Sequence, residues 1–236
     1  MAKKIAIIVA NPAVSTTLKR PVGFWASELI HPYHEFTEKG YDITIASPKG
    51  GEVKMDSLSD PRDESGYSSW DKLSQNYLED DTFEEKLKST IAVPDLDVND
   101  FNAIVVAGGQ SPMFSFEDEK GLHQFFSDFY QTGKPTAALC HGVAILKWAK
   151  DESGMPIAKG RKVTGFSNPE EDEADKAVGE KVMPWRIQDA MTELGANFVH
   201  GENWEAFAVE DGNLITGQQQ MSGKKVAELV IKQLEQ

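Results

Sequence analysis

A cysteine and a histidine, Cys140 and His141, stand together where a short apolar run gives way to a helical pattern. Residues 136–139 predict a buried strand, and the apolar spacing after Gly142 predicts a helix. A nucleophilic side chain at such a turn is held up from the sheet, beside the unpaired N–H groups and positive dipole end of the helix. That environment lowers the pKa of a thiol. A lone cysteine can also be a small buried apolar residue, but its position at the turn favours a reactive thiol.

Two glycines follow another apolar run, 103–107, which also predicts a buried strand. The sequence there is Gly108-Gly109-Gln110. Glycines at the carboxyl end of a parallel strand let the backbone approach a ligand closely, and their N–H groups can stabilise an oxyanion. The run lacks the spacing of a dinucleotide or phosphate-binding motif. We therefore expect these three residues to contact the substrate or its oxyanion.

Glu28 is a carboxylate within a predicted helix over 22–39. It lies four residues after Phe24, on or beside the apolar face of that helix, and Pro32 predicts a kink four residues later. A carboxylate in such a place can be buried with a raised pKa, close to a thiol whose protons it manages. Periodicity alone equally allows Glu28 to face solvent.

Two further carboxylates, Glu170 and Glu171, belong to a stretch interpreted as an acidic loop, 166–173, just past a predicted strand at 162–165. Either could hydrogen-bond to His141 and fix its tautomer, as the acid of a triad does. The sequence of this stretch does not decide between them.

Predicted strands separated by predicted helices indicate an α/β fold with a doubly wound, largely parallel sheet and helices on both faces. In such sheets ligands bind at the carboxyl ends of the strands. Three of the candidate groups are predicted to lie there: Gly108-Gly109, Cys140-His141 and Glu170-Glu171. The remaining strands are predicted at 5–10, 41–47, 198–199, 207–209 and 214–216, and the remaining helices after 121, at 181–194 and at 227–234.

The stretch 50–94 differs from the rest in being rich in Asp, Glu and Ser. Its aromatic residues, among them Trp70, Tyr77 and Phe83, suggest one or two helices. A long polar insertion between the elements of an α/β core usually covers the site or contacts a second subunit. We expect a single domain over 1–236 with this insertion as a small cap.

Composition narrows the possible partners and location. The chain has 236 residues and a net charge of −14, which argues against nucleic acid and anionic membranes as partners. Its one cysteine cannot form an intramolecular disulfide. No apolar stretch approaches the roughly 20 residues that span a bilayer, and the run 5–10 is too short for a signal peptide. We expect a cytoplasmic protein, where an unpaired thiol stays reduced.

The pattern from Ile5 to the final helix resembles the PfpI-type branch of the class I glutamine amidotransferase-like superfamily, and within it the heat-shock chaperone and glutathione-independent glyoxalase (glyoxalase III) group. The resemblance implies a flavodoxin-like α/β sandwich with a small cap, usually a homodimer. It also implies a lyase that converts methylglyoxal and water to D-lactate without glutathione, metal or other cofactor. The motifs that carry it are Ala138-Leu139-Cys140-His141-Gly142, Glu28 within 27–32, Gly108-Gly109, the stretch 164–168 and the insertion 50–94.

The resemblance also implies a role for each matching residue. Cys140 corresponds to the nucleophile that forms a hemithioacetal with the aldehyde, and Glu28 to the buried carboxylate that shuttles protons. His141 corresponds to the triad histidine. Glu171 is preferred over Glu170 as its acidic partner because it keeps the spacing found in the family.

Other functions stay open at this point. A holdase chaperone for unfolded protein clients is suggested by the aromatic residues Trp70, Tyr77 and Phe83, and a redox sensor by oxidation of Cys140. A cysteine hydrolase, such as a peptidase or an amidase or deglycase, is less favoured. Amidotransferases carry a late His-x-Glu pair, which His200 does not form, and the PfpI peptidases lack the long insertion.

Overall fold

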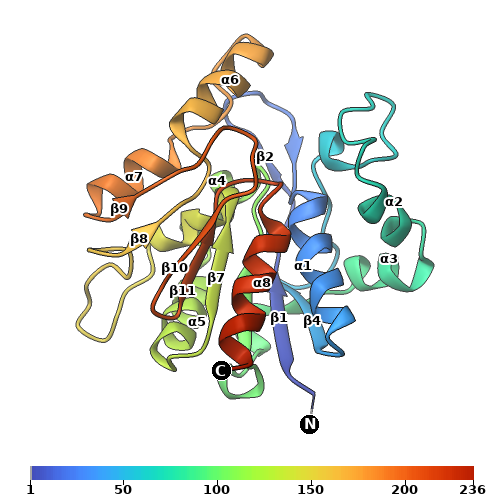
Figure 1. Ribbon diagram of the computed structural model, residues 1–236. Coiled ribbons are helices and arrows are strands. Elements are labelled where there is room, and N and C mark those ends of the chain that lie inside the picture. The colour runs from blue at the N-terminus through green and yellow to red at the C-terminus, as the bar shows by residue number, and fades with distance from the viewer. Residues whose placement is uncertain (1) are drawn as a thin grey trace.

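A seven-stranded sheet lies at the centre of the protein (Figure 1). The computed structural model describes residues 2–236. The strands are β1 (Lys4–Ile8), β4 (Asp42–Ser47), β5 (Ile91–Ala92), β6 (Ala103–Val106), β7 (Thr136–Leu139), β10 (Ala208–Asp211) and β11 (Leu214–Gly217). Their order is β10-β11-β7-β6-β1-β4-β5, and all neighbours are parallel except β10 and β11. The prediction of a largely parallel sheet is confirmed.

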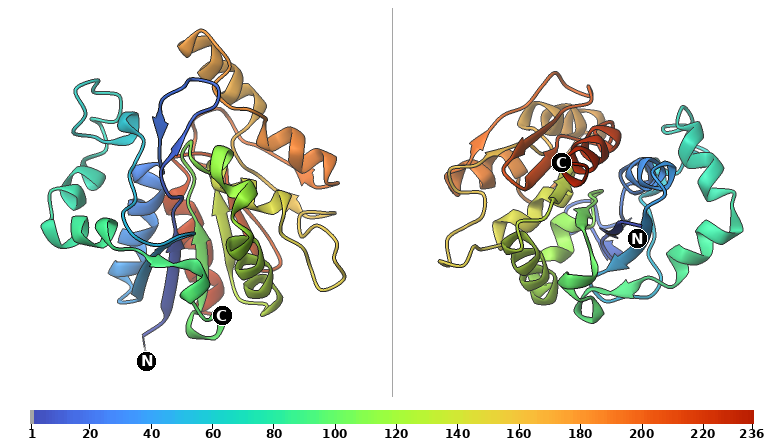
Figure 2. Two further views of the ribbon diagram at one scale, coloured as in Figure 1. Left: turned by 180° about the vertical axis from the view of Figure 1, so that it is seen from behind. Right: turned by 60° about the horizontal axis from the view of Figure 1, so that its bottom comes forward.

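Side chains of the central strands alternate between two buried cores, one on each face of the sheet. In β1, Ile5 and Ile7 enter one core while Ala6 and Ile8 enter the other. Helices α1 (Ala26–Glu38) and α8 (Gly223–Leu234) pack on the first core, and α5 (Lys120–Gln131) and α7 (Ile187–Glu193) on the second. Figure 2 shows the helices on both faces. A strand buried on both faces has to be apolar throughout, which explains the continuous apolar runs.

Strand order places the carboxyl ends of β6 and β7 side by side. Without the edge strands β5 and β10, the parallel strands follow the chain order 2-1-3-4-5, as in flavodoxin-like sheets. Val106 of β6 pairs with Ala138 of β7, so the two strands end at the same level. Ligands bind at this edge in open α/β sheets.

Three predicted elements differ from the structure. The helix predicted after the cysteine is a 3₁₀ helix, η5 (Cys140–Lys147). β8 (Lys162–Val163) pairs with β9 (Asn197–Phe198) in a separate two-stranded sheet and does not join the main one. The acidic stretch after it is not a loop but the start of helix α6 (Asn168–Val178), which the Ser167–Glu170 capping box and a proline in the first turn initiate.

The stretch 50–94 contains η1 (Ser57–Ser59), α2 (Lys72–Leu78) and α3 (Asp81–Lys88), which lie beside α1 in Figure 1. Tyr77 and Phe83 pack edge-on against Tyr33 of α1. The helix α1 continues without interruption through Pro32. No helix among residues 2–236 is long and apolar enough to cross a membrane. The remaining elements are β2 (Ala13–Val14), β3 (Pro21–Val22), η2 (Val93–Asp95), η3 (Val98–Asp100), α4 (Pro112–Ser115) and η4 (Phe116–Asp118).

Candidate active site

Cys140 occupies a strained turn between β7 and η5. Its φ of 54° is in the left-handed region, which residues with a Cβ rarely adopt. Gly142 makes the turn possible, because a Cβ there would lie 2.6 Å from the carbonyl oxygen of Val106. Strain of this kind is concentrated at functional sites. The turn has the form of a nucleophile elbow, with the cysteine at its apex.

The imidazole of His141 lies between the thiol and a carboxylate. Its Nδ1 is 3.6 Å from Cys140 Sγ, and its Nε2 is 2.8 Å from Glu171 Oε1. The ring stacks on Phe166 with the centroids 4.4 Å apart. Sequence reasoning left open whether this ring points away from the thiol; in the structure it contacts the thiol.

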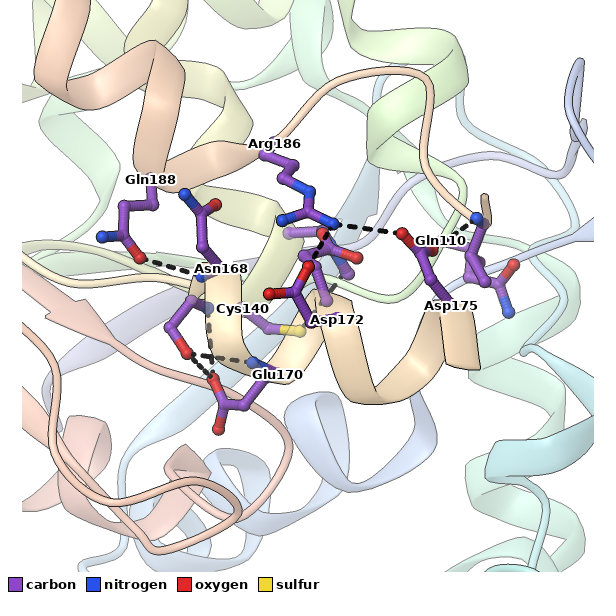
Figure 3. A network of polar contacts seen from close by, with 12 residues as sticks. Gln110, Cys140, Asn168, Glu170, Asp172, Asp175, Arg186 and Gln188 are labelled. Carbon is purple, nitrogen blue, oxygen red and sulfur yellow. Dashed lines mark hydrogen bonds and ion pairs between the residues drawn. The ribbon is translucent and has the colours of Figure 1, made fainter. Parts of the chain in front are cut away.

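Helix α6 positions Glu171, and its own position is fixed by polar contacts (Figure 3). The backbone N–H of Asn168 donates to Gln188 Oε1 at 2.8 Å. Arg186 binds Asp172 at 2.7 Å and Asp175 at 3.1 Å, one helical turn apart. The N-terminus and the middle of α6 are therefore both tied to the start of α7.

The neighbouring Glu170 makes different contacts. It accepts a hydrogen bond from the Ser167 hydroxyl at 2.7 Å, from the Trp204 backbone N–H at 3.0 Å and from Gln218 Nε2 at 2.9 Å. Of the two carboxylates that the sequence left as alternatives, Glu171 is the one that contacts the histidine. Glu170 holds α6 to the loops around it.

Glu28 is fully buried in the first turn of α1. Its Oε2 accepts a hydrogen bond from the backbone N–H of Gly108 at 2.7 Å. The carboxyl also interacts with the side chain of Cys140, although no partner among residues 2–236 is in hydrogen-bonding geometry with Oε1. Burial raises the pKa of Glu28 to about 8, against the opposing effects of Cys140 and Gly108. This carboxyl is thus mostly protonated at neutral pH.

The pKa of the Cys140 thiol is raised, first by burial and then by the nearby Glu28 carboxyl. The backbone N–H groups of His141 and Gly109 contact the sulfur and oppose the rise. The expectation that the turn would lower this pKa is therefore wrong, because desolvation outweighs the amide dipoles. A thiol of this kind needs a base to become a nucleophile, and His141 is in position.

The expected oxyanion donors are only partly free. Gly109, with a φ of 98°, and His141 direct N–H groups toward the sulfur. The N–H of Gly108 is occupied by Glu28, and that of Gln110 donates to Asp56 Oδ2 at 2.8 Å. Backbone donation to an oxyanion by Gly108 and Gln110 therefore does not fit the structure.

Asp56 is a buried residue of the site that sequence reasoning missed. Besides Gln110, it accepts the backbone N–H of Gly23 at 3.0 Å, and so joins the stretch 50–94 to the end of β6. Burial raises the pKa of Asp56 to about 6, and the hydrogen bonds from the two N–H groups only partly oppose this rise. Its surroundings in the sequence are polar, so no pattern indicated burial.

A cavity of about 270 Å³ opens over the thiol. Cys140, His141 and Glu171 line it, and the stretch 50–94 contributes Leu58 and Tyr67. Gln110 is also among the residues that line it. Within residues 2–236, no group of three or more His, Cys, Asp and Glu side chains is arranged to hold a metal ion.

Known proteins are similar to this chain over nearly its whole length. Glyoxalase 3 of Candida albicans is 29% identical over 221 residues, which cover 92% of this chain and 91% of that protein. The crystal structure of glyoxalase III from the same organism has a TM-score of 0.80 at 26% identity, covering 98% of this chain and 96% of that one. The structure of the Rapid Encystment Protein 24 KDa of Francisella tularensis has a TM-score of 0.87 at 29% identity, covering 98% and 99%. Residues 21–233 match the DJ-1/PfpI family, to which this chain therefore belongs.

Proposed function

We propose that this protein is a glutathione-independent glyoxalase, a lyase that converts methylglyoxal and water to D-lactate and protects against carbonyl stress. The observation that carries the proposal is a single thiol, Cys140, contacted by the His141–Glu171 pair and by the buried Glu28 carboxyl. The similarity to proteins named glyoxalase supports the choice of a small reactive aldehyde as substrate.

In the first step, His141 activates the thiol. An Nε2–H that donates to Glu171 leaves Nδ1 free to accept the thiol proton. The sulfur of Cys140 then bonds to the aldehyde carbon, C1, and the carbonyl electrons move to its oxygen. The N–H groups of Gly109 and His141 are positioned to stabilise the oxyanion, and the imidazolium returns the proton to give a neutral hemithioacetal.

In the second step, Glu28 moves a proton from C1 to C2. A carboxyl with a pKa of about 8 can both accept and give a proton near neutral pH. C1 is oxidised to a thioester while C2 is reduced from ketone to alcohol, so no external oxidant is needed. Water then attacks the thioester, which releases lactate and restores the Cys140 thiol.

The proposal also covers the domain organisation, the location and the oligomeric state of the enzyme. The stretch 50–94 acts as a cap of a single domain over 1–236, supported by Leu58 and Tyr67 in the cavity wall. A cytoplasmic location suits a catalytic thiol, which must stay reduced. A homodimer is implied by the family resemblance.

The holdase alternative has less support. Phe83 is only 2% exposed and packs with Tyr77 and Tyr33, so little of the expected aromatic surface is free to bind clients. Trp70 remains 49% exposed. Client binding and oxidation of Cys140 stay predictions.

The test is formation of D-lactate from methylglyoxal by purified protein, with a chelator present and glutathione absent. The two lactate enantiomers are measured separately with stereospecific dehydrogenases. We expect D-lactate in excess over the uncatalysed reaction. Absence of D-lactate from folded protein would contradict the proposal.

A further inference from the structure

The cavity over Cys140 has an apolar wall that methylglyoxal does not need. Part of the wall is a stripe along α6 that begins at Glu171 and continues through Ala174 to Val178. Residues spaced by three and four share a helix face, and seven residues of helix rise roughly 10 Å. The stripe therefore leads away from the reacting sulfur. The apolar wall residues are Leu58, Ala174, Ala177, Val178, Val182 and Met183.

The size of the cavity exceeds what the smallest substrate fills. An apolar cavity of about 150 Å³ is large enough for benzene, whereas this one is about 270 Å³. It has room for a six-membered ring in addition to the two carbonyl groups of an α-oxoaldehyde. Val178, at the outer end of the stripe, is 44% exposed, so apolar surface there stays in water until something covers it.

A second wall is aromatic and held in place. Trp204 has a φ of 62°, an uncommon conformation for a bulky residue, and its backbone N–H is bound by Glu170. Its ring meets Phe166 edge-on at 5.7 Å, and Phe166 stacks on His141. A fixed aromatic surface beside the catalytic histidine suits an aromatic or branched group, which packs against ring faces and edges.

Charge does not favour an anionic group in this space. The guanidinium group among the lining residues, Arg20, lies within electrostatic reach of the Asp56 carboxylate. Glu171 is paired with His141. Among residues 2–236, the others that line the cavity include no lysine, aspartate or glutamate.

We propose that the preferred substrate is an α-oxoaldehyde with a bulky apolar substituent, of the size of phenylglyoxal, whose ring lies along the Ala174–Val178 stripe and against Trp204. This inference rests on the proposed function. The reaction balances as for methylglyoxal: C1 is oxidised from aldehyde to carboxylate, C2 is reduced from ketone to alcohol, and one water is consumed. One buried methylene in an apolar pocket is worth about tenfold or more in kcat/KM, so a ring should give at least that.

The experiment measures, in three proteins, the ratio of kcat/KM for phenylglyoxal to kcat/KM for methylglyoxal. Wild type should have a ratio of about ten or more. Ala174→Phe fills the stripe one turn from Glu171 and should lower the ratio at least about tenfold. Lys176→Phe adds the same side chain on the same helix, off the stripe, and should leave the ratio unchanged. Comparing ratios between variants cancels the different intrinsic reactivities of the two aldehydes.

Each outcome supports or overturns the inference. Conversion of methylglyoxal with a ratio near one would overturn it and leave the proposed function standing, whereas conversion of neither aldehyde would remove the proposed function itself. An unchanged ratio in Ala174→Phe would show that the stripe does not hold the substituent. A higher kcat/KM for 4-carboxyphenylglyoxal than for phenylglyoxal would favour an anionic group bound by Arg20 and contradict the apolar assignment.

Discussion

The carboxylates Glu170 and Glu171 are adjacent in the chain but make different contacts. One substitution at each position therefore separates an effect on catalysis from an effect on stability. Glu171→Gln keeps the size of a side chain that lies 2.8 Å from His141 Nε2. A carboxylate can only accept a hydrogen bond from Nε2–H. An amide can also donate a hydrogen bond to Nε2, and so favour the tautomer with its proton on Nδ1. That proton would face the thiol, and His141 could no longer act as its base. The corresponding substitution in serine proteases costs about 10⁴ in kcat.

We therefore expect Glu171→Gln to lower kcat/KM about 10³- to 10⁴-fold, a loss of roughly 4 to 5.5 kcal/mol in transition-state stabilisation. The free energy of unfolding should change little, because the amide still fills the site and can still form a hydrogen bond to the ring. The assay is the initial rate of D-lactate formation at several methylglyoxal concentrations.

Glu170→Gln is the matched control. It removes a charged acceptor from hydrogen bonds with Ser167, Trp204 and Gln218, which should lower the free energy of unfolding by roughly 1 to 3 kcal/mol. For a chain of this size that is a drop in Tm of about 2 to 4 °C per kcal/mol. Its kcat/KM should stay close to wild type. Equal losses of activity in the two folded variants, or full activity in Glu171→Gln, would refute the assignment of the triad.

Three further predictions concern the buried acids Glu28 and Asp56 and the glycine that binds Glu28, Gly108. Glu28 has a folded pKa of about 8 against an ordinary value of 4.5, so between these pH values the folded protein holds a proton that the unfolded chain has released. The free energy of unfolding should therefore fall as pH rises through that window. The loss should be several kcal/mol, at about 1.36 kcal/mol per pKa unit. Urea unfolding at several pH values should show this slope in wild type and a flatter one in Glu28→Gln. Gly108→Ala places a Cβ 2.7 Å from Glu28 Oε2 and should lower kcat/KM by roughly 100-fold through misplacement, with activity near wild type counting against the role of Glu28. Asp56→Asn leaves one of two buried N–H groups, of Gly23 or Gln110, without an acceptor and should cost about 1 to 3 kcal/mol in urea unfolding; an unchanged midpoint would show that Asp56 does not hold this loop.

Apolar periodicity predicted the central sheet because its strands are buried on both faces. The runs 5–10, 103–107 and 136–139 match β1, β6 and β7 within two residues at each end. The order of the strands then brought the Gly108–Gly109 pair and Cys140 to one edge. This part of the site follows from local pattern and general topology.

The other features of the site depend on contacts between residues far apart in the chain, which the local sequence pattern does not predict. Burial of Glu28 requires the N–H of Gly108, which is 80 residues away. The choice of Glu171 over Glu170 follows from where α6 starts. The sequence contains the Ser-x-x-Glu capping signal and the proline that start this helix, although its acidic composition is also typical of a loop. The raised pKa of Cys140 reflects the depth of its burial.

The proposed mechanism depends on the Cys140 thiol as the nucleophile in the formation of D-lactate. Its most direct test is kcat/KM for methylglyoxal in Cys140→Ala, with thermal unfolding to show that the variant is folded. Because the chain has no other cysteine, no second thiol can replace the first. We expect a folded protein with D-lactate formation at the uncatalysed rate. A folded Cys140→Ala variant that forms D-lactate as fast as wild type would contradict it.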